Sequence, residues 1–263
     1  MATKSRLEKS LATIKPGDYP ALMTHVVLGY PSLEKSIELV QIMAENGAAI
    51  IELQIPFSDP MADGPSIMGA CEHALAEGVT PLHCLDAMSK LSSKIDTPLL
   101  FMSYYNLVLN QKGFAKAASD AGCEGLIVPD ITPGESKDSF FTECESESLP
   151  VIPLVSPITS ETRMKQIASN STSAPFVYCV STTGTTGARD KLPEELPSYL
   201  ENVKKHFPVP RALGFGISER AHIQQLQGNA EIAIVGSAVI NVIKESKNPL
   251  TEVSKFIQIL SKK

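Results

Sequence analysis

Short apolar runs rich in β-branched residues alternate along the chain with longer segments in which apolar residues recur every three or four positions. The short runs predict eight strands, and the longer segments predict helices between them. The predicted strands are Ala21–Leu28, Ala48–Ile55, Pro98–Tyr104, Gly125–Asp130, Pro150–Val155, Phe176–Ser181, Arg211–Gly216 and Ile232–Ser237. Most are apolar on both faces, which is typical of parallel strands covered by helices on one side and a barrel interior on the other.

Helices are predicted between these strands and after the last one. The predicted helices are Ser32–Glu45, Thr80–Lys94, Phe114–Ala121, Glu135–Glu147, Ser160–Ala168, Pro193–His206, Glu219–Gln227 and Pro249–Leu260. Several are followed by glycine, as at Gly47, Gly122 and Gly228, which is typical of a helix end. A charged, amphipathic stretch near the N-terminus predicts an extra helix before the first strand.

The number and order of these elements indicate the fold class. Eight strands alternating with helices in 263 residues match a (β/α)8 TIM barrel. The main alternative is an open, doubly wound sheet, which usually has fewer strands. No linker or change in composition divides the chain, so we expect a single barrel domain over residues 1–263.

Charge argues against partners that require a basic surface. The chain has 29 Asp and Glu against 23 Lys and Arg, a formal net charge of −6. We therefore expect no binding to nucleic acid or anionic lipid. The N-terminus lacks the apolar core of a signal peptide, and no run reaches the roughly 18 apolar residues of a membrane span. These features predict a cytoplasmic protein.

The cysteines point away from metal or disulfide chemistry. They are widely spaced, without a CxxC pair or a Cys–His cluster, so we expect buried free thiols and no metal site. The five are Cys71, Cys84, Cys123, Cys144 and Cys179.

Carboxylates gather at the end of the second predicted strand, where the segment Ile51–Pro65 reads IELQIPFSDPMADGP. Strand alternation places Glu52 and Gln54 on one face. A carboxylate inside an apolar strand is costly to bury without a partner, so Glu52 is either a buried, hydrogen-bonded structural residue or an acid/base group. Asp59 and Asp63 follow in a loop that three prolines stiffen, although Asp59 alone also fits a simple turn.

Glycine-containing turns follow three consecutive predicted strands, at Gly184–Gly187, Gly214–Gly216 and Gly236–Ser237. Glycine lets backbone N–H groups approach an anion closely, and phosphate sites recur after the seventh and eighth strands of this fold. Each turn alone is weak evidence, but the three together favour binding of a phosphate group.

The segment IELQIPFSDPMADGPSI resembles the signature of the tryptophan synthase α chain family. Further segments similar to the family occur along the chain in the order expected for it. They are LGYPS, SYYNLV, VPD, STTGTTG, GFGIS and VGSA. The resemblance implies a TIM barrel that cleaves indole-3-glycerol phosphate to indole and glyceraldehyde 3-phosphate, with neither a metal nor an organic cofactor in this chain.

The resemblance also implies roles for individual residues. Glu52 matches the catalytic acid/base, and Asp63 matches the carboxylate that binds the indole N–H. Tyr178 matches a residue beside the catalytic Glu, and Thr186 a residue of a mobile lid. The residues that match the phosphate pocket are Gly187, Gly216, Gly236 and Ser237.

Three positions depart from the family pattern. Gln54 stands where glycine is usual, Met68 where glutamine is frequent, and His25 where an aromatic ring is common. We expect Gln54 to crowd the indole pocket or to hydrogen-bond Glu52. If Gln54 only fills space, replacing it with glycine leaves activity within a few-fold or raises it by relieving crowding.

The family also implies a partner, the tryptophan synthase β subunit, in a complex of two α and two β chains. Pyridoxal phosphate is then expected in the β partner, and Asp59 is expected to bond across the interface. The loop Pro56–Pro65 has the composition of an exposed contact surface, with apolar Phe57 and Met61. Two alternatives stay open: a noncatalytic subunit that only activates a β partner, and another phosphate-binding barrel such as a sugar-phosphate isomerase or epimerase.

Overall fold

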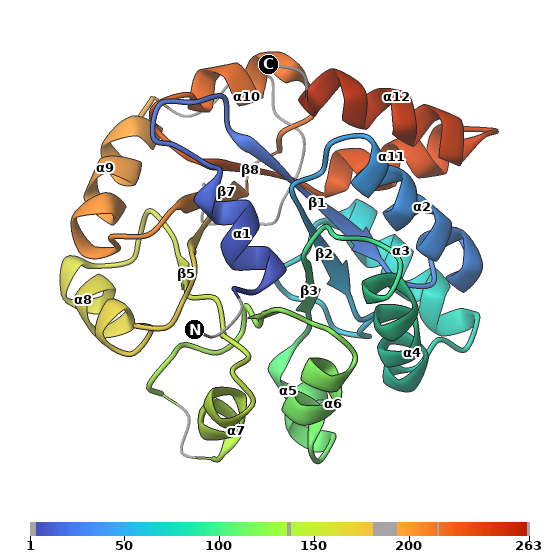
Figure 1. Ribbon diagram of the computed structural model, residues 1–263, viewed down its shortest axis with the longest axis horizontal. Helices are drawn as coiled ribbons and strands as arrows, with labels where there is room; N and C mark the ends of the chain where they lie inside the picture. Colours follow the sequence, from blue (N-terminus) through green and yellow to red (C-terminus); the bar gives the residue numbers. More distant parts are fainter. Residues whose placement is uncertain (1–3, 136–137, 181–193, 215, 262–263) are drawn as a thin grey trace.

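The computed structural model describes residues 4–135, 138–180, 194–214 and 216–261. Within these residues, eight parallel strands form one curved sheet with helices around it (Figure 1). The strands are β1 (Ala21–Val27), β2 (Ile50–Gln54), β3 (Leu99–Met102), β4 (Leu126–Ile127), β5 (Leu154–Val155), β6 (Val177–Val180), β7 (Arg211–Gly214) and β8 (Ile232–Val235). Their order across the sheet is β4-β3-β2-β1-β8-β7-β6-β5.

The two ends of this sheet meet. A parallel bridge joins Leu126 on β4 to Val151, just before β5. The Leu126 N–H donates to the Pro150 carbonyl at 2.9 Å, and the Ile152 N–H donates to the Leu126 carbonyl at 2.8 Å. The ring of strands is thereby closed, which confirms the predicted TIM barrel over an open doubly wound sheet.

The helices of the described residues are α1 (Arg6–Ala12), α2 (Leu33–Glu45), α3 (Pro65–Ala76), α4 (Pro81–Ser92), α5 (Tyr105–Asn110), α6 (Phe114–Asp120), α7 (Phe140–Ser146), α8 (Glu161–Ser169), α9 (Leu196–His206), α10 (Arg220–Leu226), α11 (Ser237–Glu245) and α12 (Pro249–Ser261). The extra N-terminal helix is present as α1. The eight other predicted helices are present, although α7 begins at Phe140 rather than at Glu135. Gly47, Gly122 and Gly228 all have positive φ, as expected after helix ends.

Helices α3, α5 and α11 are not predicted from the sequence. The start of α3 at Pro65 suits proline, which tolerates the first position of a helix. Its buried residues Ile67, Ala70, Cys71 and Ala74 recur at three- and four-residue intervals. That spacing is the sequence signal of a helix at α3. The helix lies between β2 and β3, where only one helix is predicted from the sequence.

Strand alternation divides the core into two layers. Ile50, which shares a face of β2 with Glu52, belongs to the apolar cluster inside the barrel. Ile51, Leu53 and Ile55 pack in the larger cluster between strands and helices. The predicted alternation on β2 is therefore confirmed, and Glu52 projects into the barrel rather than toward the helices.

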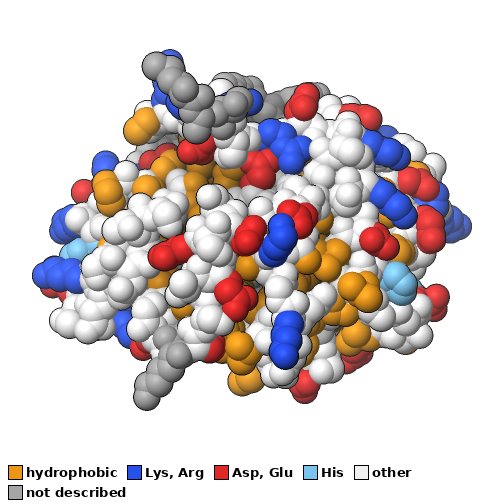
Figure 2. All heavy atoms as spheres, turned by 60° about the horizontal axis from the view of Figure 1, so that its bottom comes forward, with side chains coloured by type: hydrophobic (Ala, Val, Ile, Leu, Met, Phe, Trp, Pro, Cys, Tyr) orange, Lys and Arg blue, Asp and Glu red, His pale blue; other side chains and the backbone are white. Residues whose placement is uncertain are grey.

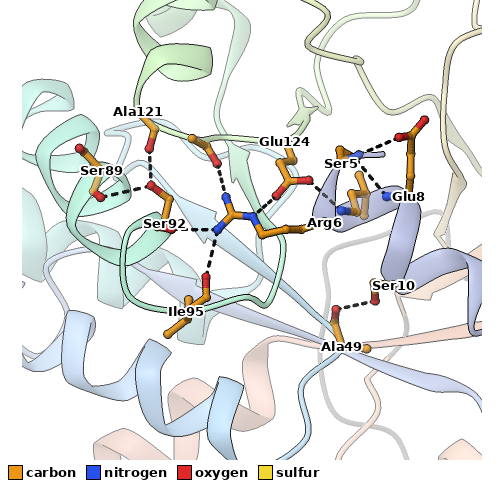
Figure 3. Close-up of polar contacts among 12 residues, drawn as sticks. Ser5, Arg6, Glu8, Ser10, Ala49, Ser89, Ser92, Ile95, Ala121 and Glu124 are labelled. Atoms are coloured by element: carbon orange, nitrogen blue, oxygen red, sulfur yellow. Dashed lines mark hydrogen bonds and ion pairs between the residues drawn. The ribbon is translucent and has the colours of Figure 1, made fainter. Parts of the chain in front are cut away.

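Helix α1 covers the end of the barrel at which the strands begin. Leu7 packs in the interior cluster, and Arg6 pairs with Glu124, which precedes β4, at 2.6 Å (Figure 3). The other Glu124 oxygen accepts from the Leu7 N–H at 2.7 Å. The Arg6 guanidinium also donates to the carbonyls of Ser92 (2.9 Å), Ile95 (3.0 Å) and Gly122 (3.3 Å). This network fixes the N-terminal helix over the barrel and leaves the opposite end for a site.

The described surface has no dominant positive patch on the face shown in Figure 2, where acidic and basic side chains are interspersed. This agrees with the net charge of −6. Of the helices described, none is both long enough and apolar enough to cross a membrane.

Candidate active site

A cavity opens at the end of the barrel where the strands finish, opposite α1. Its walls combine carboxylates, apolar side chains and glycine backbone. It is lined by His25, Glu52, Ala62, Asp63, Ile67, Met102, Ile127, Pro129, Leu154, Tyr178, Val180, Gly214, Gly216, Ile217, Ile234, Gly236, Ser237 and Ala238. The apolar part can accommodate an aromatic ring, and the polar groups are few, as is typical of a small-molecule site.

Six of the residues to which the family resemblance gives a role in the site line this one cavity. They are Glu52, Asp63, Tyr178, Gly216, Gly236 and Ser237. Asp59 is exposed and lies outside the cavity lining. Thr186 and Gly187 fall outside the described residues.

Glu52 has a buried partner on the neighbouring strand. The parallel register of β1 and β2 sets His25 beside Glu52. The His25 Nδ1 lies 3.2 Å from the Glu52 Oε2, and the two side chains are 6% and 2% exposed. Burial lowers the pKa of His25, but the charges of Glu52 and Asp63 and hydrogen bonding to Glu52 and Gln54 outweigh it, so the pKa is raised above 6.5. Glu52 is therefore paired with a group that itself takes up and releases a proton.

Asp63 is held by two neutral donors. The Gln54 Nε2 donates to the Asp63 Oδ2 at 2.7 Å, and the Tyr104 hydroxyl donates to the same oxygen at 3.0 Å. Burial raises the pKa of Asp63 above its usual value, while the charge of His25 and these hydrogen bonds oppose the increase. The carboxylate is thus fixed in place by neutral donors, and among the described residues the only positive charge that acts on it is that of the titratable His25.

The expectation for Gln54 is wrong in both of its forms. Gln54 is fully buried, is absent from the cavity lining, and hydrogen-bonds Asp63 rather than Glu52. The reason is that the loop after β2 folds back and places Asp63 over the end of the strand, which alternation alone does not predict. Met68, another position that departs from the family pattern, also lies outside the cavity lining. Its side chain is 38% exposed on α3.

Sequence reasoning missed Tyr104 as a residue of the site. Its hydroxyl accepts from the Ala62 N–H at 3.0 Å while donating to Asp63, so it ties the carboxylate loop to the end of β3. Its ring stacks on Phe57, with centroids 5.1 Å apart and planes at 20°. Phe57 is therefore half-buried, which corrects the expectation that it is an exposed contact residue, whereas Met61 is 87% exposed.

Tyr178 faces the cavity from β6, next to Gly214 at the end of β7. A Cβ at Gly214 would approach the Tyr178 ring to between 2.9 and 3.2 Å, so glycine leaves the ring its position. Burial, together with the negative charges of Glu52 and Asp63, raises the pKa of Tyr178 well above 10. The hydroxyl therefore stays protonated near neutral pH and remains a hydrogen-bond donor.

The part of the cavity lining formed by Gly216, Gly236 and Ser237, the glycine wall, can bind an anion. Gly236 precedes α11, and Ser237 is the first residue of that nine-residue helix. The first N–H groups of a helix lack partners within it, and the helix dipole favours negative charge there. Gly216, with φ of +25°, adds another glycine backbone segment at the same wall.

Nothing in the described part of the chain groups three His, Cys, Asp or Glu side chains as a metal site would require. All five cysteines are free and buried, as predicted. Burial raises the pKa of every one of these thiols to about 12, so they are inert as nucleophiles at neutral pH.

Comparisons with known proteins agree with this geometry. The family model described as tryptophan synthase alpha chain matches residues 11–262. The tryptophan synthase alpha chain of Desulfotalea psychrophila is 40% identical over 242 residues, which cover 91% of this chain and 94% of the relative. That of Roseiflexus castenholzii is 38% identical over 262 residues, covering 97% and 99%.

Solved structures show the same relationship. A chain in a structure of Mycobacterium tuberculosis tryptophan synthase superposes with a TM-score of 0.89 at 32% identity, covering 98% of both chains. A tryptophan synthase alpha chain from Legionella pneumophila gives 0.86 at 29% identity, covering 98% of this chain and 97% of that one. Sequence and fold agree over nearly the whole length, and the chain belongs to the tryptophan synthase alpha chain family.

Proposed function

We propose that Glu52 and Asp63 carry out the reaction of this family, in which a lyase cleaves indole-3-glycerol phosphate to indole and glyceraldehyde 3-phosphate. The observation that carries the proposal is that both carboxylates line one partly apolar cavity whose glycine wall includes the start of α11. An indole ring fits the apolar side, and a phosphate fits the helix start.

Glu52 acts as the acid/base group. The carbon–carbon bond breaks once the ring carbon bearing the glycerol phosphate side chain is protonated. As the bond breaks, the adjacent hydroxyl loses its proton and becomes the aldehyde of glyceraldehyde 3-phosphate. A single carboxyl group that gives the first proton and takes the second balances the reaction, and Glu52 is buried in the cavity beside a titratable histidine.

Asp63 stabilises the charge that develops on the substrate. Protonation of the ring carbon creates positive charge that is shared with the ring nitrogen. A carboxylate that accepts a hydrogen bond from that N–H interacts more strongly with the charged form than with the neutral substrate. Asp63 suits this role because its only described hydrogen-bond donors, Gln54 and Tyr104, are neutral.

We assign the phosphate to the glycine wall, with Gly216, Gly236 and Ser237 as its ligands. Thr186 and Gly187, outside the described residues, are assigned to the lid and the phosphate pocket by resemblance. Tyr178 lines the cavity on β6 and donates from a neutral hydroxyl near Glu52. All eight strands belong to one sheet, which supports treating the chain as a single domain.

The family works in a complex with a β partner. We propose a complex of two α and two β chains in the cytoplasm, with pyridoxal phosphate held by the β chain and no cofactor held by this one. The loop around Asp59 supports the assignment of the interface, because Asp59 and Met61 are exposed beside the site while Ala62 and Asp63 are anchored by Tyr104.

Release of indole from indole-3-glycerol phosphate by the purified chain tests the proposed function. We expect the chain alone to release indole, and we expect the β subunit to accelerate this release. The variant Asp63→Asn should lose the activity. Absence of turnover both alone and with the β subunit, combined with activation of the β reaction, would instead identify a noncatalytic regulatory subunit.

A further inference from the structure

Gln54 makes its strongest contact with a carboxylate that the proposed function uses. It is the last residue of β2, on the same strand face as Glu52, and its side chain is completely buried. Its amide nitrogen lies 2.7 Å from the Asp63 Oδ2. A hydrogen bond this short to an ionised acceptor is among the stronger ones in proteins, whereas a residue that only fills space needs no such contact.

The two donors on Asp63 meet at one oxygen. Gln54 and Tyr104 both donate to Oδ2, from the ends of neighbouring strands. The other oxygen, Oδ1, receives no hydrogen bond from the residues described, although Asp63 lines the cavity. A carboxylate fixed at one oxygen by two donors is held in one orientation, with its second oxygen available to a ligand.

The identity of the donor matters as much as its position. An amide stabilises the ionised carboxylate but, unlike Lys or Arg, leaves its negative charge in place. It also has no proton to exchange with Asp63 near neutral pH. Gln54 thereby orients Asp63 and favours its ionised form at the same time.

We propose that Gln54 is a positioning residue for Asp63, whose amide fixes one carboxylate oxygen so that the other accepts the hydrogen bond of the indole N–H. The inference rests on the proposed function. It assigns to the glutamine, at a position where the family pattern has glycine, a specific part in recognition of the indole end of the substrate.

The test replaces Gln54 with methionine, which keeps the volume of the side chain and removes the donor. We expect affinity for indole to fall about tenfold, the scale of a lost hydrogen bond to a charged group. Affinity for glyceraldehyde 3-phosphate, bound at the glycine wall, should stay within about twofold. Thr24→Val is the matched control, because it removes a buried polar group from the adjacent strand β1 outside the cavity lining.

The pH profile of kcat/KM separates positioning from a structural role. The Gln54 hydrogen bond lowers the pKa of Asp63, so its loss should move the acid limb of the profile to higher pH. His25 on β1, Glu52 on β2 and Tyr104 after β3 also act on Asp63. Because Gln54 hydrogen-bonds His25 as well, its loss lowers the pKa of His25 and weakens the positive charge beside Asp63, which moves the acid limb in the same direction. The Thr24→Val profile should match that of the wild type.

Gln54→Gly, which introduces the residue usual in the family, provides a second variant if methionine disturbs folding. Both variants are checked by circular dichroism and thermal unfolding. Wild-type indole affinity with an unmoved acid limb in a folded variant overturns the inference, and so does failure of both variants to fold, because Gln54 would then serve the fold instead. If the wild type itself does not cleave indole-3-glycerol phosphate, the proposed function fails. If it does and Asp63→Asn does not, only the role of Gln54 is in question.

Discussion

The two ends of the barrel use carboxylates of the strand ends in opposite ways. At the end where the strands begin, Glu124 pairs with Arg6, and Glu231 pairs with Arg211 at 2.6 Å, so each faces a permanent positive charge. At the other end, Glu52 faces a histidine, and Asp63 faces an amide and a phenol.

The difference lies in whether the partner can change its charge. A guanidinium stays protonated at every relevant pH, so it keeps its carboxylate ionised and committed to structure. Imidazole titrates near neutrality, and amide and phenol groups are neutral, so they orient a carboxylate while leaving it free for proton transfer or for charge stabilisation. The same residue type is thus held by permanent charges at one end and by titratable or neutral partners at the other, where we propose that the chemistry takes place.

The largest expected effect is on catalysis, and it compares one carboxylate from each end. Glu52→Gln removes the proton-transfer group while keeping its shape, so indole formation should fall at least about a hundredfold. Glu124→Gln makes the same change at the other end and should leave steady-state activity within about twofold. Similar activities in the two variants would contradict the proposed difference between the two ends of the barrel.

The next largest effect is on stability. Arg6→Met leaves Glu124 without its charged partner and three backbone carbonyls without their donor. The free energy of unfolding, from urea titration, should fall by about 2 kcal/mol, because partly buried acceptors that lose their donor stay desolvated without a hydrogen bond. kcat at 25 °C should stay near the wild-type value. A large decrease in kcat with unchanged stability would show that the two ends are coupled.

A smaller effect concerns pH and the His25–Glu52 pair. The pKa of folded His25 is raised above the unfolded value near 6.5, so protonation favours the folded state. The resulting stabilisation is fully present below about pH 6.5 and is lost as pH rises through the raised value. Urea unfolding across this range should show a decline in wild-type stability that is absent in His25→Phe. Parallel stability curves for the two proteins would contradict the pairing.

The smallest expected effect on the isolated chain is that of Asp59→Ala. Asp59 is exposed, and its described side-chain partner is the hydroxyl of Ser58, at 2.6 Å. We expect the variant to reduce acceleration by the β subunit several-fold and to change the basal rate less. Indole release with and without β, together with size-exclusion chromatography of the mixture, measures both. Equal losses in the two rates would place Asp59 in the site rather than at the interface.

Much of the fold is predictable because side-chain periodicity is a local property. Alternation on β2 predicts that Glu52 points into the barrel, and three- and four-residue spacing predicts α2, α4 and α12 closely. The start of α7 is predicted less well, and α3 is overlooked, because its small residues Ala70, Cys71 and Ala74 make a weak apolar stripe.

The residues of the site were identified by their motif, but their partners were not. The sequence by itself determined a parallel eight-stranded barrel, its family, and the two carboxylates that we propose as catalytic, because periodicity and motif are written within short segments. Only the tertiary structure decided that His25 faces Glu52, through the register of β1 and β2, and that Gln54 and Tyr104 hold Asp63, through the fold of the loop after β2. These contacts join separate segments of the chain, and their distances depend on strand register and loop path, which no local pattern specifies.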